Sequence, residues 1–131
     1  MICLILAGGF ATRMYPKGAQ QAKALLSYKG QPVISHLINS IPSHIPVLVT
    51  TNKKFEASFL QWKNQPSRDI SILTEDTLTD EQKPGAVGAI NLWVQKMNIK
   101  EDLWIIAGDN YFEYQNRKYS PYRVNDNPFP L

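Results

Sequence analysis

The sequence has little of what several common classes of protein require. Cysteine occurs once, at Cys3, which excludes an intrachain disulfide, and its place in an apolar run predicts packing rather than chemistry. No apolar run is long enough to cross a bilayer, and the first residues lack the charged start and cleavage site of a signal peptide. The formal net charge of +3 is mild, which argues against nucleic acid as a partner. We therefore expect a cytoplasmic protein that binds neither nucleic acid nor membranes.

What is present is an alternation of short apolar runs and amphipathic stretches over 131 residues, a length that suits one compact domain. Four apolar runs are predicted as strands, namely residues 1–6, 46–51, 70–73 and 103–107. Three stretches with apolar residues at spacings of three and four are predicted as helices, namely residues 33–41, 54–63 and 85–97. This order predicts an α/β fold, with a Rossmann-like, doubly wound and mainly parallel sheet and helices on both faces.

The last predicted helix carries apolar residues at Val87, Ile90, Val94 and Met97, which we expect to form its buried stripe. Trp93 falls on the same helix, and we interpret it as a core residue rather than a stacking platform for a ligand.

Three connections are long. Residues 7–22 follow the first strand, residues 74–84 form an acidic loop, and residues 114–131 form a polar tail that contains prolines. In an open α/β sheet, ligands bind beyond the carboxyl ends of the strands, and the first two loops leave from that edge. We therefore predict a ligand-binding domain over residues 1–113 and an irregular tail over residues 114–131.

The first strand ends in Gly8 and Gly9, and the cations Arg13, Lys17 and Lys23 follow. Glycines permit a tight turn and close approach of a ligand, and consecutive backbone N–H groups can form a nest for phosphate oxygens. Arginine and lysine suit phosphate as well, so a polyphosphate is one interpretation. The alternative is a tight turn with solvated cations. The spacing matches neither the P-loop nor the dinucleotide-binding fingerprint.

Asp109 lies just beyond the last predicted strand, in "IIAGDN". A carboxylate at that edge would face the same crevice as the glycine loop, and could hold Mg²⁺ against nucleotide phosphates. The alternative interpretation is a turn residue or helix cap. A basic phosphate loop opposite Asp109 favours the metal.

Three blocks of sequence resemble the family of sugar-1-phosphate nucleotidyltransferases. The first, "LAGGFATRMYP…AKALLSYKGQPVISHLI", resembles its pattern L-A-G-G-x-G-T-R-[LM]-x-P, then P-K-x-L-L and G-x-P-[IL]. The blocks "KPGAVGAI" and "IIAGDN" resemble its later helix start and its hydrophobic-Gly-Asp motif. They fall in the family's order and cover residues 1 to about 113, so the chain is similar to a C-terminally shortened member.

The resemblance implies a role for each matching residue. Arg13 and Lys23 would be catalytic, because they would neutralise the triphosphate and hold phosphate near the reacting centre, and Asp109 would bind Mg²⁺. The residues implied to contact the nucleotide are Leu6, Ala7, Gly8, Gly9, Ala11 and Gly85. The implied reaction is attack of a sugar-1-phosphate oxygen on the α-phosphorus of a nucleoside triphosphate, with release of pyrophosphate, which requires alignment and charge compensation.

The match departs from the family pattern at two positions, where Ala11 replaces a glycine and Ala22 replaces a proline. Gln82 is a candidate for reading the base, and an exposed loop glutamine is the alternative. Two other functions stay open: a non-catalytic nucleotide-binding module, and a nucleotidyltransferase that acts on a molybdenum cofactor or another phosphorylated alcohol. The family continues its sheet beyond the Gly-Asp motif, so an exposed edge is expected here, which favours a homodimer.

Overall fold

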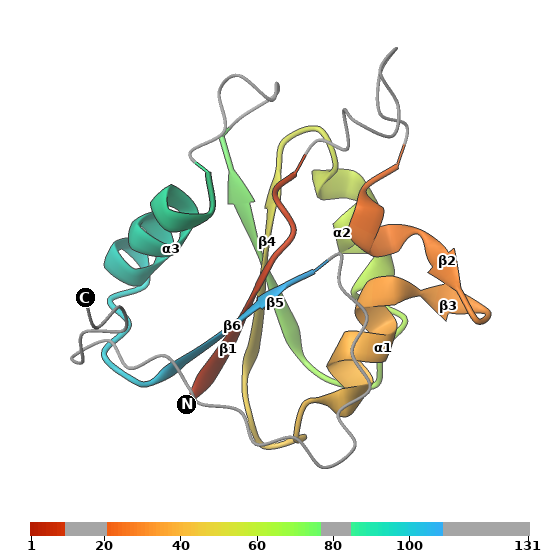
Figure 1. Cartoon of the computed structure of the whole chain (residues 1–131), viewed down its shortest axis with the longest axis horizontal. Coiled ribbons are helices and arrows are strands. Elements are labelled where there is room, and N and C mark those ends of the chain that lie inside the picture. Colours follow the sequence, from red (N-terminus) through yellow and green to blue (C-terminus); the bar gives the residue numbers. More distant parts are fainter. Residues whose placement is uncertain (10–20, 77–84, 109–131) are drawn as a thin grey trace, which may run out of the picture.

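A parallel sheet forms the centre of the structure, a computed structural model that describes residues 1–9, 21–76 and 85–108. The sheet has four strands in the order β5-β4-β1-β6 (Figure 1). Their bounds are β1 Ile2–Leu6, β4 Val47–Asn52, β5 Ile70–Glu75 and β6 Leu103–Ala107. All neighbouring pairs are parallel, which confirms the predicted α/β class. The β5 strand is longer than predicted and ends at Glu75, so the acidic loop begins later than residue 74.

The central strand is β1, which pairs with β4 on one side and β6 on the other. Leu4 lies opposite Leu48 of β4 and Ile105 of β6. All six residues of β4 are buried. Because both faces of these strands are buried, neither face carries alternating polar residues, and the strands appear in the sequence as continuous apolar runs.

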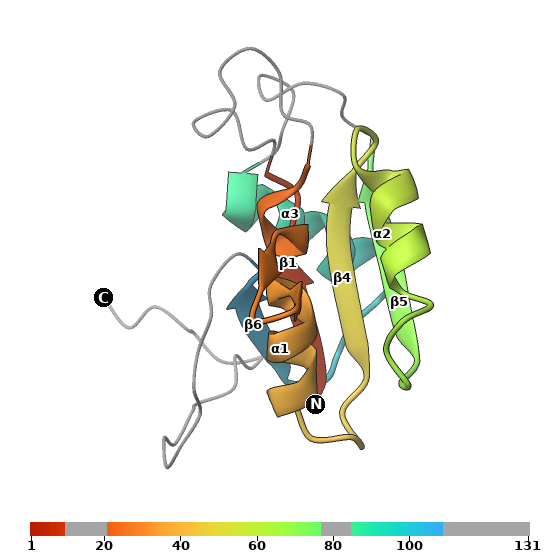
Figure 2. The ribbon, with the colours of Figure 1, turned by 90° about the vertical axis from the view of Figure 1, so that its right-hand side faces the viewer.

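Helices cover both faces of the sheet. The helices α1 (Val33–Ser40) and α2 (Glu56–Trp62) lie on one side, and α3 (Gly85–Lys96) lies on the other (Figure 1). Figure 2 looks onto the side of α1 and α2, where α2 packs against β4 and β5. No helix in the described ranges has the length and apolar character needed to span a membrane.

A short β-hairpin, which the sequence did not predict, precedes α1. A 3-10 turn, η1 (Lys23–Leu25), leads into antiparallel β2 (Ser27–Tyr28) and β3 (Gln31–Pro32). Lys29 and Gly30, which link the two strands, both have positive φ, as in the tight turns that join antiparallel strands. Strands of two residues are too short to show an alternating pattern, so only the turn could have indicated them.

The predicted buried stripe on α3 is confirmed only in part, since Ile90 and Val94 are partly buried and pack against the cluster beneath the helix. Val87 is 74% exposed and Met97 is 47% exposed, whereas the buried residues of this helix are Ala89 and Trp93. The segment is helical, as its spacing predicted, but the residues that face the sheet most directly are Ala89 and Trp93, with Ile90 and Val94 partly buried. Trp93 packs in a cluster with leucines from β1, β4, β5 and β6, and these distant side chains determine which face is covered. Trp93 is therefore a core residue, as predicted.

Candidate functional site

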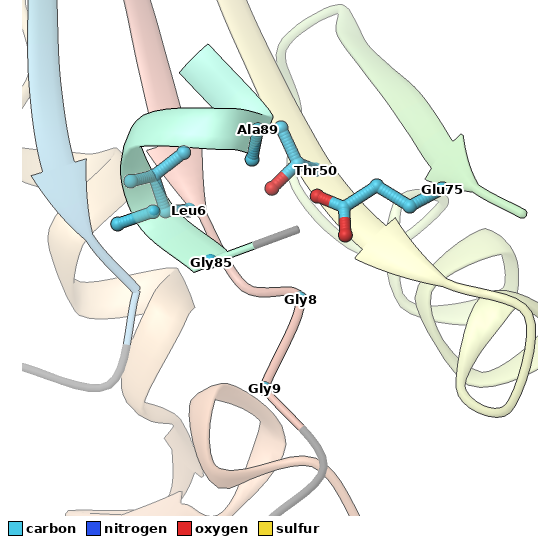
Figure 3. A pocket seen from close by; sticks show the side chains of 8 residues that line it. Leu6, Gly8, Gly9, Thr50, Glu75, Gly85 and Ala89 are labelled. Carbon is cyan, nitrogen blue, oxygen red and sulfur yellow. The ribbon is translucent and has the colours of Figure 1, made fainter. Parts of the chain in front are cut away.

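A pocket lies where the carboxyl ends of β1, β4 and β5 meet the start of α3 (Figure 3). Its volume is about 220 Å³, and the described residues that line it are Leu6, Gly8, Gly9, Thr50, Glu75, Gly85, Ala86 and Ala89. Ligands of open α/β sheets bind at this edge. Sites for drug-sized ligands range from roughly 300 to 1,000 Å³, so this pocket suits one ring-sized group.

The backbone that leaves β1 is held in place by β4. The Ala7 N–H donates to the Thr50 carbonyl oxygen at 3.0 Å. The Asn52 amide, which is fully buried, donates from Nδ2 to the Gly8 carbonyl at 2.9 Å and to the Gly9 carbonyl at 3.4 Å. Its Oδ1 accepts the Phe55 N–H at 3.1 Å. Because these bonds use both ends of a buried amide, Asn52 fixes the start of the glycine loop relative to the turn after β4.

Close packing against Glu75 favours glycine at position 8. A Cβ atom at Gly8 would lie 3.0 Å from Oε2 and 3.1 Å from Oε1 of that carboxylate. Such contacts are tighter than nearly all those that real Cβ atoms make, so a larger residue would require the carboxylate to shift by a few tenths of an ångström. A Cβ atom at Gly9 would meet nothing within 4 Å. Close packing therefore accounts for glycine at position 8 but not at position 9.

Glu75 is the buried acidic group of the site. It is 4% exposed and is the last residue of β5, and its carboxylate points into the pocket beside Thr50 (Figure 3). Burial raises its pKa above the usual value, and the indole N–H of Trp93 lowers it by a smaller amount. That indole N–H is buried and lacks a partner of hydrogen-bonding geometry among the described residues. The approach of Trp93 to the carboxylate is therefore close but falls short of a full hydrogen bond.

Gly85 begins α3 on the other side of the pocket (Figure 3). Its φ is +76°, a left-handed conformation that favours glycine. The N–H groups of the first turn of a helix have no partners within the helix, so this end of α3 favours electronegative groups.

The structure brings four of the predicted site residues together, because Leu6, Gly8, Gly9 and Gly85 line the same pocket. Ala7 lies between them in sequence, but its side chain packs in the core on the opposite face, so only its backbone is available there. The predicted roles of these residues stay predictions.

The predicted cationic and metal-binding residues are placed differently. Lys23 is half-buried in η1 and is not among the described residues that line the pocket. Ala11, Arg13, Gln82 and Asp109 lie outside the described residues. Gly108, which precedes Asp109 in sequence, donates its N–H to the Leu6 carbonyl at 2.9 Å, at the end of β1.

The described residues alone do not make a metal site. No group of three His, Cys, Asp or Glu side chains is found among them, and Glu75 is the one carboxylate in the described lining of the pocket. A single carboxylate with a raised pKa is a poor ligand set for Mg²⁺, which prefers charged oxygens. The Mg²⁺ prediction therefore depends on Asp109.

Sequence reasoning missed Thr50, Asn52 and Glu75, which are polar residues at the ends of β4 and β5. The available signal was the change from apolar to polar residues in "VLVTTN" and "ISILTE", at the edge where ligands bind.

Comparison with known proteins assigns the chain to a family. The family profile described as "Nucleotidyl transferase" matches residues 2–123. The chain belongs to this family. It is 26% identical over 125 residues to a protein of Sulfolobus acidocaldarius assigned as a mannose-1-phosphate guanyltransferase, covering 91% of this chain and 33% of the relative. It is also 26% identical over 113 residues to the bifunctional protein GlmU of Methanococcus maripaludis, covering 86% of this chain and 26% of that protein.

Solved structures show the same fold in longer chains. A structure assigned as a glucose-1-phosphate thymidylyltransferase from Bacillus anthracis superposes with a TM-score of 0.72 and 23% identity, covering 86% of this chain and 46% of that chain. The inositol-1-phosphate CTP transferase from T. maritima superposes with a TM-score of 0.61 and 11% identity, covering 84% of this chain and 44% of that chain. The nucleotidyl transferase chain described here spans a third or less of the curated relatives and under half of these structures.

Proposed function

We propose that this chain supplies the nucleotide site of an enzyme that transfers a nucleoside monophosphate from a nucleoside triphosphate to a sugar-1-phosphate. The observation that carries the proposal is the pocket in which residues from the end of β1 and the start of α3 face each other. The family match over residues 2–123 supports it, because the same segments carry the motifs that resemble sugar-1-phosphate nucleotidyltransferases.

In the proposed reaction, the pocket holds the base and ribose, and the triphosphate extends toward the glycine loop. A phosphate oxygen of the sugar-1-phosphate attacks the α-phosphorus, the bond from that phosphorus to the oxygen bridging to the β-phosphorus breaks, and pyrophosphate leaves. Asn52 keeps the Gly8 and Gly9 backbone in place for this approach. Arg13 and Lys23 would balance the phosphate charge, which is the main contribution that such a transfer requires of the protein.

Mg²⁺ belongs to the proposal through Asp109. When bound, the ion would neutralise charge on the phosphates. A carboxylate directly after Gly108 suits this task, since Gly108 is hydrogen-bonded to Leu6 at the edge of the pocket.

Release of pyrophosphate tests the proposal. The full chain is incubated with Mg²⁺, each of the four common nucleoside triphosphates and a set of sugar-1-phosphates. Mannose-1-phosphate and guanosine triphosphate are tested first, because the Sulfolobus acidocaldarius relative is named for that chemistry. We expect pyrophosphate from at least one pair, and little from the Arg13→Ala and Asp109→Ala variants.

Thermal denaturation with each Mg²⁺-nucleotide completes the test, since ligand that binds the native state raises the Tm. A rise in Tm without pyrophosphate from any pair would indicate a nucleotide-binding module instead of an enzyme. No rise with any nucleotide would contradict the proposed site.

A further inference from the structure

We propose that Glu75 reads the base of the bound nucleotide and selects guanine. The inference rests on the proposed function and concerns the same pocket. It names a substrate class, the guanine nucleotides, and a specificity residue that differs from the predicted Gln82.

The first observation is a buried carboxylate for which the described residues supply little hydrogen-bonding compensation. Glu75 is 4% exposed and its carboxylate points into the pocket (Figure 3). Burial of a carboxylate is costly unless donors compensate it, and most buried polar groups have such partners. Among the described residues, the donor that acts on the Glu75 carboxylate is the indole N–H of Trp93, and it does not reach hydrogen-bonding geometry. The carboxylate is therefore ready to accept bonds from a ligand.

The second observation is the surroundings of the carboxylate. Leu6, Ala86 and Ala89 supply apolar surface to the pocket, and Gly8 and Gly85 leave space at its edges. A planar ring can lie against such a surface while its edge meets the polar group. The absence of a Cβ at Gly8 leaves room for the carboxylate at this position.

The chemistry of the four bases then identifies the ligand. An ionised carboxylate only accepts hydrogen bonds, and its two oxygens are best matched by two adjacent N–H donors. Guanine presents such a pair, the N1–H and the exocyclic N2–H. Adenine and cytosine each present one amino group beside an acceptor nitrogen, and uracil presents one N–H between two carbonyl oxygens. Guanine alone satisfies both oxygens of Glu75 without placing an acceptor against them.

The test is titration calorimetry of the full chain with the Mg²⁺ complexes of GTP, ATP, CTP, UTP and ITP. We expect GTP to bind at least about tenfold more tightly than ATP, CTP or UTP, which is the discrimination typical of one bidentate pair. ITP keeps the N1–H but lacks the 2-amino group, so it is expected to bind about five- to tenfold more weakly than GTP.

Two variants test whether base preference depends on the Glu75 carboxylate in the pocket or only on the loss of one negative charge from this part of the chain. Glu75→Gln replaces one acceptor by a donor, so the preference for GTP over UTP should fall by about tenfold or more, because an amide can pair with an N–H and the adjacent carbonyl of either guanine or uracil. Asp76→Asn is the matched control, since it removes the same charge from the next residue, which is exposed and outside the pocket. Its preference for GTP should equal that of the wild type. Circular dichroism confirms that both variants fold.

The outcomes distinguish this inference from the proposed function. Binding of no nucleotide would contradict both. Tight binding with equal affinity for all bases, a preference for another base, or an unchanged GTP preference in Glu75→Gln would overturn the guanine inference alone. Loss of GTP preference in Glu75→Gln, with that preference kept in Asp76→Asn, would confirm it.

Discussion

The two faces of the sheet differ in what they bury. The face under α1 and α2 holds the larger cluster of buried side chains, which includes Phe59 and Trp62. The face under α3 holds a smaller cluster, and only Ala89 and Trp93 are buried on that helix. The β1 strand serves both, because Ile5 belongs to the first cluster and Leu4 to the second. One face is closed by packing, and the other leaves its carboxyl end open for a ligand.

The two buried tryptophans show the same difference in hydrogen bonding. The Trp62 indole donates to Ser35 Oγ at 2.9 Å, whereas the Trp93 indole has no partner of good geometry among the described residues. On the first face the Arg68 guanidinium also donates to several carbonyl oxygens around the end of α1, including that of Ile41 at 2.7 Å. Buried polar groups left without partners are uncommon in stable cores, and they are expected where a ligand completes the site.

The largest expected effect is on the closed face. Phe59→Ala removes a ring that is 0% exposed and should lower the free energy of unfolding by about 3–5 kcal/mol. Leu60→Ala, on the same helix but 45% exposed, is the control and should cost under about 1 kcal/mol. Urea denaturation followed by circular dichroism measures both. Similar costs for the two variants would contradict the assignment of this face as the main core.

The next largest effect on stability is expected at Gly8, beside the pocket on the α3 face of the sheet. Gly8→Ala places a Cβ against the Glu75 carboxylate and should lower the free energy of unfolding by about 1–3 kcal/mol. Gly9→Ala, where no atom lies within 4 Å, should leave stability within about 0.5 kcal/mol of the wild type. If the contact with Glu75 is the cause, Glu75→Ala should relieve most of the cost in the double variant. Equal costs at both glycines would rule out that contact.

A smaller effect compares the tryptophans directly. Trp62→Phe and Trp93→Phe lose similar ring area, but only the first leaves a buried hydroxyl, Ser35 Oγ, without its donor. Trp62→Phe should therefore lower the free energy of unfolding by about 1 kcal/mol more than Trp93→Phe. Equal losses in thermal or urea denaturation would show that the Trp62 bond contributes nothing.

The smallest effect depends on pH. Because burial raises the pKa of Glu75 in the folded state, protonation favours folding, and that contribution is lost as the pH rises through the folded-state pKa. Glu75→Gln should therefore have a higher Tm than the wild type at pH 7, and the difference should shrink as the pH falls toward the unfolded-state value of 4.5. A difference in Tm that does not change with pH would contradict the raised pKa.

The closed face was largely predictable from the sequence, and the site only in part. The apolar residues at spacings of three and four in the helix predicted over residues 54–63, Phe55, Phe59 and Trp62, are all buried, because local spacing determines which residues share a side of a helix. The face of α3 was predicted only in part, because side chains from four strands determine which residues of the helix are covered.

The contacts that shape the site join segments far apart in sequence. Gly8 contacts Asn52 and Glu75 only because β1, β4 and β5 lie side by side in the sheet. No local sequence pattern predicts contacts of this kind. The motif in residues 4–9 indicated the edge of the sheet at which the pocket lies, but not the carboxylate that points into it.

The most direct test of the central claim is an NMR titration of the ¹⁵N-labelled chain with Mg²⁺-nucleotide. The account predicts that the largest amide shift changes fall on the α3 face, at Leu6, Gly8, Gly9, Glu75 and Gly85, with little change along α1 and α2. Saturable changes centred on α1 and α2, with the amides of those five residues unmoved, would contradict it.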